Sequence, residues 1–150
     1  MRAVVQRASS ASVAVDGKTV GQIGLGLVVL LGVAPGDGAE EVAFVVRKLS
    51  GLRIFSDDDG LMNRSLHDVG GSFLIISQFT LYGDVTRGNR PSFTGAAPGE
   101  HAEAIYRDVC SKLRAGGFDV QTGLFGAHME VNLVNDGPVT IIIDTETHKV

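Results

Sequence analysis

The chain has 150 residues, of which 44% are hydrophobic and 20% charged, and its formal net charge is −4. This balance is typical of one globular domain and disfavours a disordered chain, while the acidic excess argues against a protein that binds a long stretch of nucleic acid through many phosphate contacts. The single cysteine, Cys110, excludes an internal disulfide and a cysteine-only metal site. It lies at an apolar helical position, where packing is the favoured role.

The first 23 residues are predicted to form three short strands. Valine-rich segments occupy residues 2–8, 12–15 and 19–23, and Asp16-Gly17 between the last two is a strong hairpin signal. The N-terminus lacks the charged-then-apolar order of a signal peptide. The longest apolar stretch, residues 25–33, is far shorter than the roughly 20 residues that span a bilayer. We therefore expect a cytoplasmic protein with no membrane helix and no membrane partner.

A glycine-rich segment, Gly21-Gln22-Ile23-Gly24-Leu25-Gly26, invites comparison with a phosphate-binding loop. Such a loop has to lead into the N-terminus of a helix, whose amides point at the anion. The segment that follows here, residues 27–33, is a continuous apolar run, which predicts a central strand covered on both faces. We therefore attribute the glycines to a hairpin that needs positive φ rather than to nucleotide binding.

The rest of the chain alternates between strands and helices. A capping box of Asp37 with Glu40 predicts a helix that ends at Gly51, and a second helix is expected from Pro98 to Gly116. Further strands are predicted at residues 52–55, 73–77, 120–124, 129–134 and 139–144, the last two joined by a turn. These elements indicate one α+β domain over residues 1–150, with about eight mostly antiparallel strands in a barrel-like sheet and two helices.

Two sets of residues invite a metal site, and neither fits one. The acidic turn Asp57-Asp58-Asp59-Gly60 lacks the alternating ligands and the closing glutamate of a calcium loop, so we expect a solvated turn. The histidines at positions 67, 101, 128 and 148 show no paired metal spacing. We therefore expect no metal and no cofactor.

The segment Ser77-Gln78-Phe79-Thr80-Leu81 ends an apolar run with polar groups, and polar groups at a strand end usually face a ligand. Ser77 and Thr80 are possible nucleophiles, but no histidine, lysine or carboxylate lies within the motif to activate them. One alternative is that both hydroxyls form structural hydrogen bonds at the strand end. Another is that amides around Gln78, Phe79 and Thr80 stabilise an oxyanion, with Phe79 as a wall.

The segment Asn135-Asp136-Gly137-Pro138-Val139-Thr140 sets a Gly-Pro bond between two apolar runs. Pro138 has no amide hydrogen and Gly137 tolerates positive φ, so this pair can present bare carbonyls, or a cis bond, as a rigid wedge. A wedge of backbone is suited to a steric filter.

Together, the segments 77–81 and 135–140 resemble those of the D-aminoacyl-tRNA deacylases, and the resemblance runs along the whole chain. It also covers residues 11–13, 52–55, 88–93 and 123–129. Members of this family are cytoplasmic homodimers with composite active sites at the subunit interface. The resemblance implies hydrolysis of the ester between a D-amino acid and the terminal adenosine of tRNA, while L-aminoacyl-tRNA is rejected. Whether glycyl-tRNA is also cleaved stays open.

The resemblance also implies roles for single residues. Gly137-Pro138 would be a cis dipeptide that reaches into the pocket of the partner subunit, while Ser77 and Thr80 position the ester. Gln78 and Phe79 would supply backbone and a wall. Further roles fall to Phe125 and Met129 around the terminal adenine, to Arg7 beside the Gly-Pro motif, and to Arg87 and Arg90 at acceptor-stem phosphates.

Each of these roles has a plainer alternative. Phe125 and Met129 suit core packing as well as stacking on a base, and the arginines are equally typical of a solvated face. Two other functions also remain: a non-catalytic dimeric module that binds the tRNA end, and an esterase that depends on Thr80.

Overall fold

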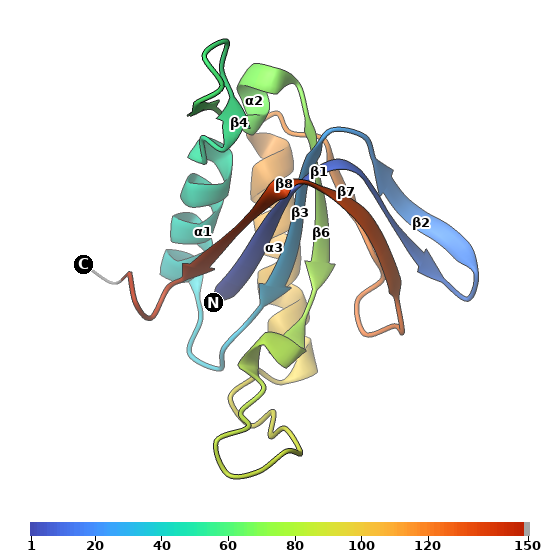
Figure 1. Ribbon diagram of the computed structural model, residues 1–150. Coiled ribbons are helices and arrows are strands. Elements are labelled where there is room, and N and C mark those ends of the chain that lie inside the picture. The colour runs from blue at the N-terminus through green and yellow to red at the C-terminus, as the bar shows by residue number, and fades with distance from the viewer. Residues whose placement is uncertain (149–150) are drawn as a thin grey trace.

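In the computed structural model, which describes residues 1–148, a curled sheet carries two long helices on one face (Figure 1). Lys149 and Val150, which the single-domain prediction includes, lie outside the described residues. The strands are β1 (Arg2–Val15), β2 (Lys18–Ile23), β3 (Gly26–Gly32), β4 (Phe55–Ser56), β5 (Met62–Arg64), β6 (Ser72–Ser77), β7 (Val120–Thr122) and β8 (Glu130–Asp144). The helices are α1 (Ala39–Gly51), α2 (Leu66–Val69), α3 (Gly99–Ala115) and the short 3-10 helix η1 (Phe79–Tyr82).

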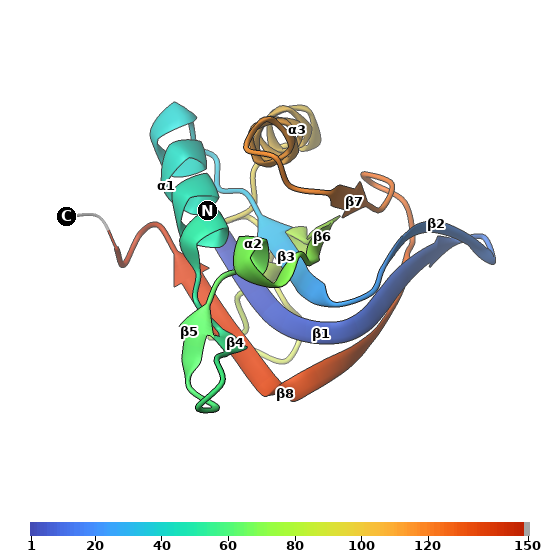
Figure 2. The same ribbon diagram turned by 90° about the horizontal axis from the view of Figure 1, so that it is seen from above.

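The prediction of an α+β fold with a mostly antiparallel, barrel-like sheet is confirmed. The main sheet runs β2-β1-β3-β6-β7, and β8 pairs with the other side of β1. The pairs β3–β6 and β6–β7 are parallel, and the other ladders are antiparallel. Figure 2 shows α1 and α3 together over one face, with β8 across the far side. Two predicted helices become three α-helices within the described residues because α2 adds a single turn, and the short 3-10 helix η1 was not predicted either.

β1 is one long strand rather than the two predicted at residues 2–8 and 12–15. Its first half pairs with β3 and its second half with β2, while β8 runs along its other edge over both halves. β2 and β3 therefore lie end to end along one edge of β1. Exposed Ser9 and Ser10 interrupt the apolar pattern locally, but pairing with β8 carries the strand through.

The glycines between β2 and β3 do not form a hairpin, so that prediction was wrong. None of Gly21, Gly24 and Gly26 has a positive φ among the described residues. The hairpin predicted at Asp16-Gly17 is confirmed, because both residues have positive φ and join the antiparallel strands β1 and β2. A Cβ on Gly26 would overlap the Ser72 carbonyl oxygen, so close approach of β3 to β6 requires a glycine there. The prediction of a central apolar strand at 27–33 is confirmed by β3, which is buried along almost its whole length.

β8 is also continuous where a turn was predicted between two strands. Both of its halves pair with β1, at Ala8↔Asn135 and again at Gln6↔Thr140. A single residue of β1, Arg7, therefore faces four residues of β8, 136–139, and these four residues form a large bulge in the ladder. The bulge pushes the Asp-Gly-Pro segment out of the sheet while both flanks stay in register.

The sheet is apolar on both faces. Alternating residues of β1, β3 and β6 pack beneath α1 and α3, and this set comprises Ala3, Val5, Leu27, Val29, Leu31, Phe73 and Ile75. The intervening residues pack inside the curl of the sheet against β8, in a second cluster of Ala8, Ala11, Val13, Ile23, Val28, Leu74 and Ile76. Cys110 of α3 is buried in the first cluster, where burial raises the pKa of its thiol.

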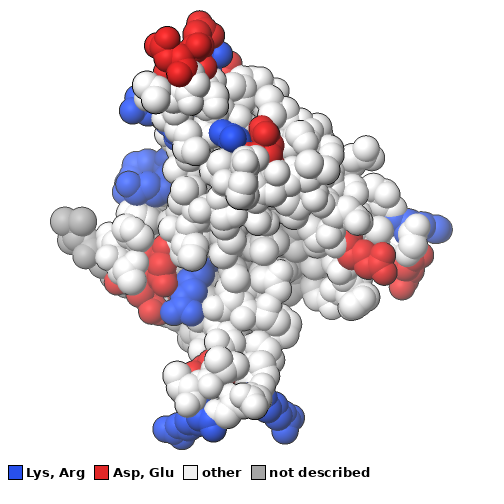
Figure 3. All heavy atoms as spheres, viewed as in Figure 1, with Lys and Arg blue, Asp and Glu red and all other residues white. Residues whose placement is uncertain are grey.

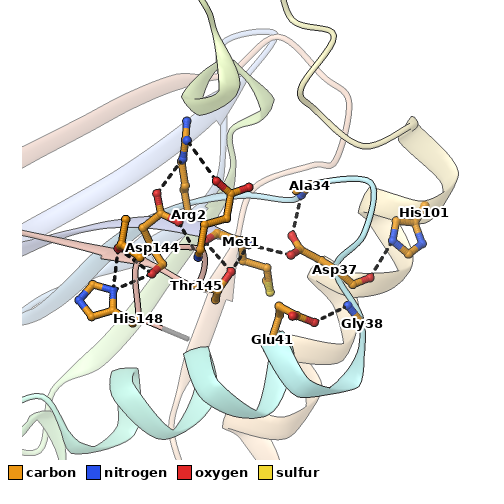
Figure 4. A network of polar contacts seen from close by, with 12 residues as sticks. Met1, Arg2, Ala34, Asp37, Gly38, Glu41, His101, Asp144, Thr145 and His148 are labelled. Atoms are coloured by element: carbon orange, nitrogen blue, oxygen red, sulfur yellow. Dashed lines mark hydrogen bonds and ion pairs between the residues drawn. The ribbon is translucent and has the colours of Figure 1, made fainter. Parts of the chain in front are cut away.

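The N-terminus is anchored inside the molecule (Figure 4). The fully buried α-ammonium group of Met1 donates to Asp37 Oδ1 at 2.8 Å and to Thr145 Oγ1 at 2.5 Å. Asp37 also accepts from the Ala34 amide at 2.6 Å. Asp37 therefore does not cap the helix as predicted. The N-cap of α1 is the next residue, Gly38, whose amide donates to the Glu41 carboxylate at 2.9 Å.

The smaller elements differ in extent from the predictions. The strand predicted at 52–55 is reduced to β4, which pairs with the unpredicted β5 across the acidic turn. In that turn the Asp57 carboxylate accepts from the amides of Asp59 and Leu61, both at 2.9 Å, so the carboxylate organises its own loop. No helix among residues 1–148 is both long enough and apolar enough to cross a membrane.

Candidate active site

The candidate site is a cavity of about 530 Å³ between the end of β6, η1, the start of α3 and the loop after β7. Five of the predicted site residues meet there or beside it. Ser77, Gln78 and Phe79 form one wall, and Phe125 and Met129 form the opposite one. The structure therefore brings together two segments that lie almost fifty positions apart in the sequence. Thr80, Arg7, Gly137 and Pro138 are not among the residues that line this cavity.

The Ser77–Phe79 wall forms because the backbone changes direction where β6 ends. The Gln78 amide still donates to the Leu31 carbonyl of β3 at 2.8 Å, so it is not available to an oxyanion, contrary to the prediction. Beyond it the chain turns into η1, whose first amides belong to Phe79 and Thr80. Within residues 1–148 neither of these amides donates a backbone hydrogen bond. They are therefore free donors at the start of η1, where Phe79 lines the cavity and Thr80 follows it.

Thr80 has no base beside it. Its hydroxyl accepts a short hydrogen bond from the Gln78 side-chain amide, and Thr80 itself is exposed. No histidine, lysine or carboxylate is hydrogen-bonded to Ser77 or Thr80 in the part of the chain that the structure describes, although His128 lines the same cavity as Ser77. A hydroxyl without a base is a poor nucleophile near neutral pH. The arrangement fits positioning of a substrate better than covalent attack.

The opposite wall is aromatic and apolar. The Phe125 ring lies 5.8 Å from the ring of Tyr106, and Met129 packs against the cluster inside the curl of the sheet. Tyr106 is buried, and its hydroxyl donates to the Ile75 carbonyl at 2.7 Å. Burial raises the pKa of Tyr106, so the phenol stays neutral and its donor stays committed. This wall can receive a flat ring, and His128, which also lines the cavity, adds an imidazole to it.

Phe93, Tyr106 and His128 are among the cavity residues that were not predicted as site residues. Phe93, from the loop before α3, packs edge-to-face on Phe79 at 5.1 Å, and both rings line the cavity. Tyr106 was predicted only as part of the apolar stripe of α3. A long glycine- and proline-punctuated loop was a signal for Phe93, since such loops are often functional. For Tyr106 there was no signal beyond its helical spacing.

A second feature, the Gly-Pro corner (residues 135–139), lies in the bulge of β8. The Gly137–Pro138 peptide bond is cis, and both residues are exposed. Asn135 closes the corner from within, because its Oδ1 accepts from the Val139 amide at 2.8 Å. A Cβ on Gly137 would overlap the backbone nitrogen of Val139, so only glycine fits this position without movement.

Arg7 ties the corner to the rest of the protein. Its Nε donates to the Asp136 carbonyl at 2.7 Å, and its Nη1 donates to the Ile54 carbonyl at 2.6 Å. The Asp136 carboxylate lies 3.6 Å from the same Nε. Only 11% of the Arg7 side chain is exposed, so these charged hydrogen bonds are partly shielded from water. Arg7 is therefore a fixed support of the corner and not a solvated surface residue.

Cavity and corner are separate features of one chain. Neither Gly137 nor Pro138 lines the cavity, and both face outward. Among residues 1–148, no group of three or more histidine, cysteine, aspartate or glutamate side chains is placed to hold a metal ion. The polar side chains that line the cavity are those of Ser77, Gln78, Tyr106 and His128, beside aromatic rings and backbone amides.

Residues 4–144 match the family model described as D-Tyr-tRNA(Tyr) deacylase. The D-aminoacyl-tRNA deacylase of Prosthecochloris aestuarii is 58% identical over 146 residues, which cover 97% of this chain and 99% of that protein. A solved structure of the c-Myc DNA Unwinding Element Binding Protein is 42% identical, with a TM-score of 0.90 over 97% of this chain and 99% of that one.

A second solved structure, of a "probable eukaryotic D-amino acid tRNA deacylase", aligns with a TM-score of 0.80 over 95% of this chain and 97% of that one. Its sequence identity is 21%, so it supports the fold alone.

Proposed function

Because the chain belongs to the D-aminoacyl-tRNA deacylase family, a family of hydrolases, we propose that it cleaves the ester between a D-amino acid and the terminal adenosine of tRNA. In this proposal the protein is a homodimer. The cavity of one subunit binds the aminoacyl-adenosine end, and the Gly-Pro corner of the other subunit excludes L-amino acids.

The observation that carries the proposal is the separation of cavity and corner. The corner is exposed, carries no side chain at Gly137, and is held by Asn135 from within and by Arg7 from β1. A rigid backbone segment that is turned away from its own cavity is suited to completing the cavity of another copy.

A corner made of backbone can distinguish a D-amino acid from an L-amino acid without recognising which side chain it carries. Its carbonyls accept hydrogen bonds from the α-ammonium group, which every aminoacyl ester carries. With the ester carbonyl fixed at Ser77–Thr80 and the ammonium group fixed at the corner, the two hands differ in where the side chain points. The D side chain leaves toward solvent, whereas the L side chain meets the backbone of Gly137 and Pro138.

The surface around the corner supports a dimer. β8 pairs with β1 along one edge, and the corner lies between its two paired halves. Val134 and Ile142, on either side of the corner, are 57% and 67% exposed. Phe79, at the cavity, is 58% exposed. Exposed apolar side chains of this kind suit an interaction surface, and a second copy of the chain would cover them.

The reaction needs little from the protein beyond positioning. Water attacks the ester carbonyl, the bond from the acyl carbon to the ribose oxygen breaks, and that oxygen takes a proton to become a hydroxyl. The amides of Phe79 and Thr80 lie at the wall where the oxyanion develops. The neighbouring ribose hydroxyl of the substrate takes the place of a protein base. Ser77 and Thr80 position the ester, and Gln78 orients Thr80.

The terminal adenine is assigned to the wall of Phe125 and Met129. A ring and a thioether present polarisable surface to the face of a base, and stacking of this kind tolerates any tRNA because every tRNA ends in the same adenosine. The close approach of Phe125 to Tyr106 fixes the orientation of the ring before the substrate arrives.

An esterase that depends on Thr80 is the second candidate, and the absence of a base at Thr80 within the described residues speaks against it. It predicts an acyl-enzyme on Thr80, whereas the proposal predicts none. Membership of a hydrolase family also disfavours the non-catalytic binding module.

The proposal is tested by incubating the purified protein with D-tyrosyl-tRNA and with L-tyrosyl-tRNA. We expect many turnovers of tyrosine release from the D-ester and release from the L-ester at the spontaneous rate. Equal rates of tyrosine release from both esters would contradict the proposed selection between D- and L-amino acids. Binding of D-tyrosyl-tRNA without release of tyrosine would instead favour the non-catalytic module that binds the tRNA end.

A further inference from the structure

The arginine loop (residues 83–98) joins η1 to α3 and carries two exposed basic groups. Arg87 and Arg90 lie at its tip, and both are exposed. Figure 3 shows basic side chains at the end of this loop, which projects at the bottom of the view. The loop contains one acidic residue, Asp84, at its base. A local excess of positive charge on a chain with a net charge of −4 needs an explanation.

The two guanidinium groups are unengaged within residues 1–148. Neither Arg87 nor Arg90 forms an ion pair, a hydrogen bond or a ring contact there. By contrast, Arg2, Arg7 and Arg64 are each paired with a carboxylate. The one carboxylate of the loop, that of Asp84, accepts from the Thr86 amide at 2.9 Å. The charge at the tip is therefore available to a ligand.

The loop also holds these charges close to the cavity. Asp84 and Ser92 exchange backbone hydrogen bonds of 2.8 and 2.9 Å, which close the base of the loop. Phe93, directly after this closure, lines the cavity and packs on Phe79. Three residues of extended chain span at most about 10 Å, so Arg90 lies within that backbone distance of Phe93. The C-terminal end of the loop therefore borders the cavity, and its tip carries the two arginines a few residues away.

We propose that Arg87 and Arg90 bind backbone phosphates of the single-stranded 3′ end of tRNA, next to the terminal adenosine. This inference rests on the proposed function, since it takes the terminal adenosine to lie in the cavity. The strand that leaves the cavity carries one phosphate per nucleotide, and guanidinium groups form charge-assisted hydrogen bonds with phosphate oxygens. Such contacts hold the strand in register without reading its sequence, which suits an enzyme that acts on many tRNAs.

The test compares the wild type with Arg87→Gln, Arg90→Gln and the double variant, and Arg47→Gln on α1 is the matched control. Arg47 is exposed and undergoes the same change of charge away from the loop. Two substrates are used: D-tyrosyl-tRNA and D-tyrosyl-adenosine, which has the ester but no phosphates. Values of kcat/KM are measured for both over a range of KCl concentrations, and circular dichroism checks the fold.

Each loop substitution should lower kcat/KM for D-tyrosyl-tRNA by about 3- to 10-fold at low salt, through KM, and the double variant should lose more. The slope of log KM against log salt should fall by about 0.7 for each lost phosphate contact. D-tyrosyl-adenosine should be cleaved at the wild-type rate by all variants, and Arg47→Gln should match the wild type.

An unchanged KM and salt slope for D-tyrosyl-tRNA in the double variant would overturn the inference. Equal losses with both substrates would also overturn it, because the loop would then support the cavity and not the strand. Failure of the proposed function is a separate result, since the wild type would then release tyrosine from neither substrate.

Discussion

Arg7 Nε donates a 2.7 Å hydrogen bond to the carbonyl oxygen of Asp136, the residue directly before Gly137. A side chain from the middle of β1 thus sets the position of the corner in β8. The same guanidinium reaches the Ile54 carbonyl, so it joins the corner to the segment that leads into β4.

Replacing Arg7 by glutamine should loosen the corner without unfolding the protein. Two carbonyls lose a charged donor, which we expect to lower the free energy of unfolding by about 1.5–3 kcal/mol. Release of tyrosine from D-tyrosyl-tRNA should slow, and L-tyrosyl-tRNA should lose part of its protection. Urea denaturation and the two deacylation rates measure these effects. Arg107→Gln, which removes an exposed ion pair with Glu103, is the control and should change neither.

The side-chain acceptor oxygen of Asn135 should stabilise the Gly-Pro corner. Asn135→Leu leaves the amide of buried Val139 without its 2.8 Å partner, at a cost of about 1–3 kcal/mol. Asn135→Asp keeps an acceptor in the same place and gives up only donor contacts of 3.4 Å, so its loss should be smaller. Urea denaturation of the two variants makes the comparison. Equal losses would mean that the acceptor does not hold the corner.

Thr80→Ala should lower the activity but not abolish it. The variant loses the hydroxyl that accepts from Gln78, but the backbone amide of residue 80 remains. We expect a fall in kcat of about tenfold or less, because a single neutral hydrogen bond is worth about 1 kcal/mol. Single-turnover kinetics and mass spectrometry of the quenched reaction provide the measurement. Complete loss of activity, with an acyl group trapped on Thr80 in the wild type, would establish the esterase mechanism instead.

The ion pair between the Met1 ammonium group and Asp37 should matter far more than a surface pair. Both groups are buried, and Asp37→Asn leaves the ammonium charge without its partner, which costs about 3–5 kcal/mol. Asp108→Asn is the control, because its pair with Lys112 is exposed and pairs of that kind contribute about 0–1 kcal/mol. Thermal and urea denaturation compare the two variants. Similar decreases in the free energy of unfolding of both variants would show that burial does not strengthen the Met1–Asp37 ion pair.

Local pattern was enough to predict the parts of the fold that depend on local composition. The continuous apolar run at residues 27–33 predicted the buried strand β3, and the stripe on the second helix predicted the buried face of α3. The polar end of the run at 73–77 predicted one wall of the cavity. In these cases each residue's neighbours in the sequence already determine its environment.

The parts that depend on distant pairing were not predicted. Asp-Gly-Pro is typical of a turn, and only the ladder with β1 makes residues 135–139 a bulge in one strand. The glycine at position 26 is required by the Ser72 carbonyl of another strand, which no local pattern reveals. Asp37 was expected to cap a helix, but the Met1 ammonium group, distant in the sequence, takes its carboxylate.

The central claim, that the corner of one subunit completes the cavity of the other, is tested most directly by the deacylation rate of a mixed dimer. One chain carries Gly137→Ala, which displaces the corner, and the other carries Ala127→Trp, which fills the cavity that Ala127 lines. Different C-terminal tags allow the mixed dimer to be purified, since the Met1 ammonium group is buried.

If the corner acts across the interface, the mixed dimer has one intact site and should release tyrosine from D-tyrosyl-tRNA at about half the wild-type rate. Each parent dimer should be nearly inactive. A mixed dimer that is no more active than its parents, or a chain that forms no dimer at all, would contradict the account.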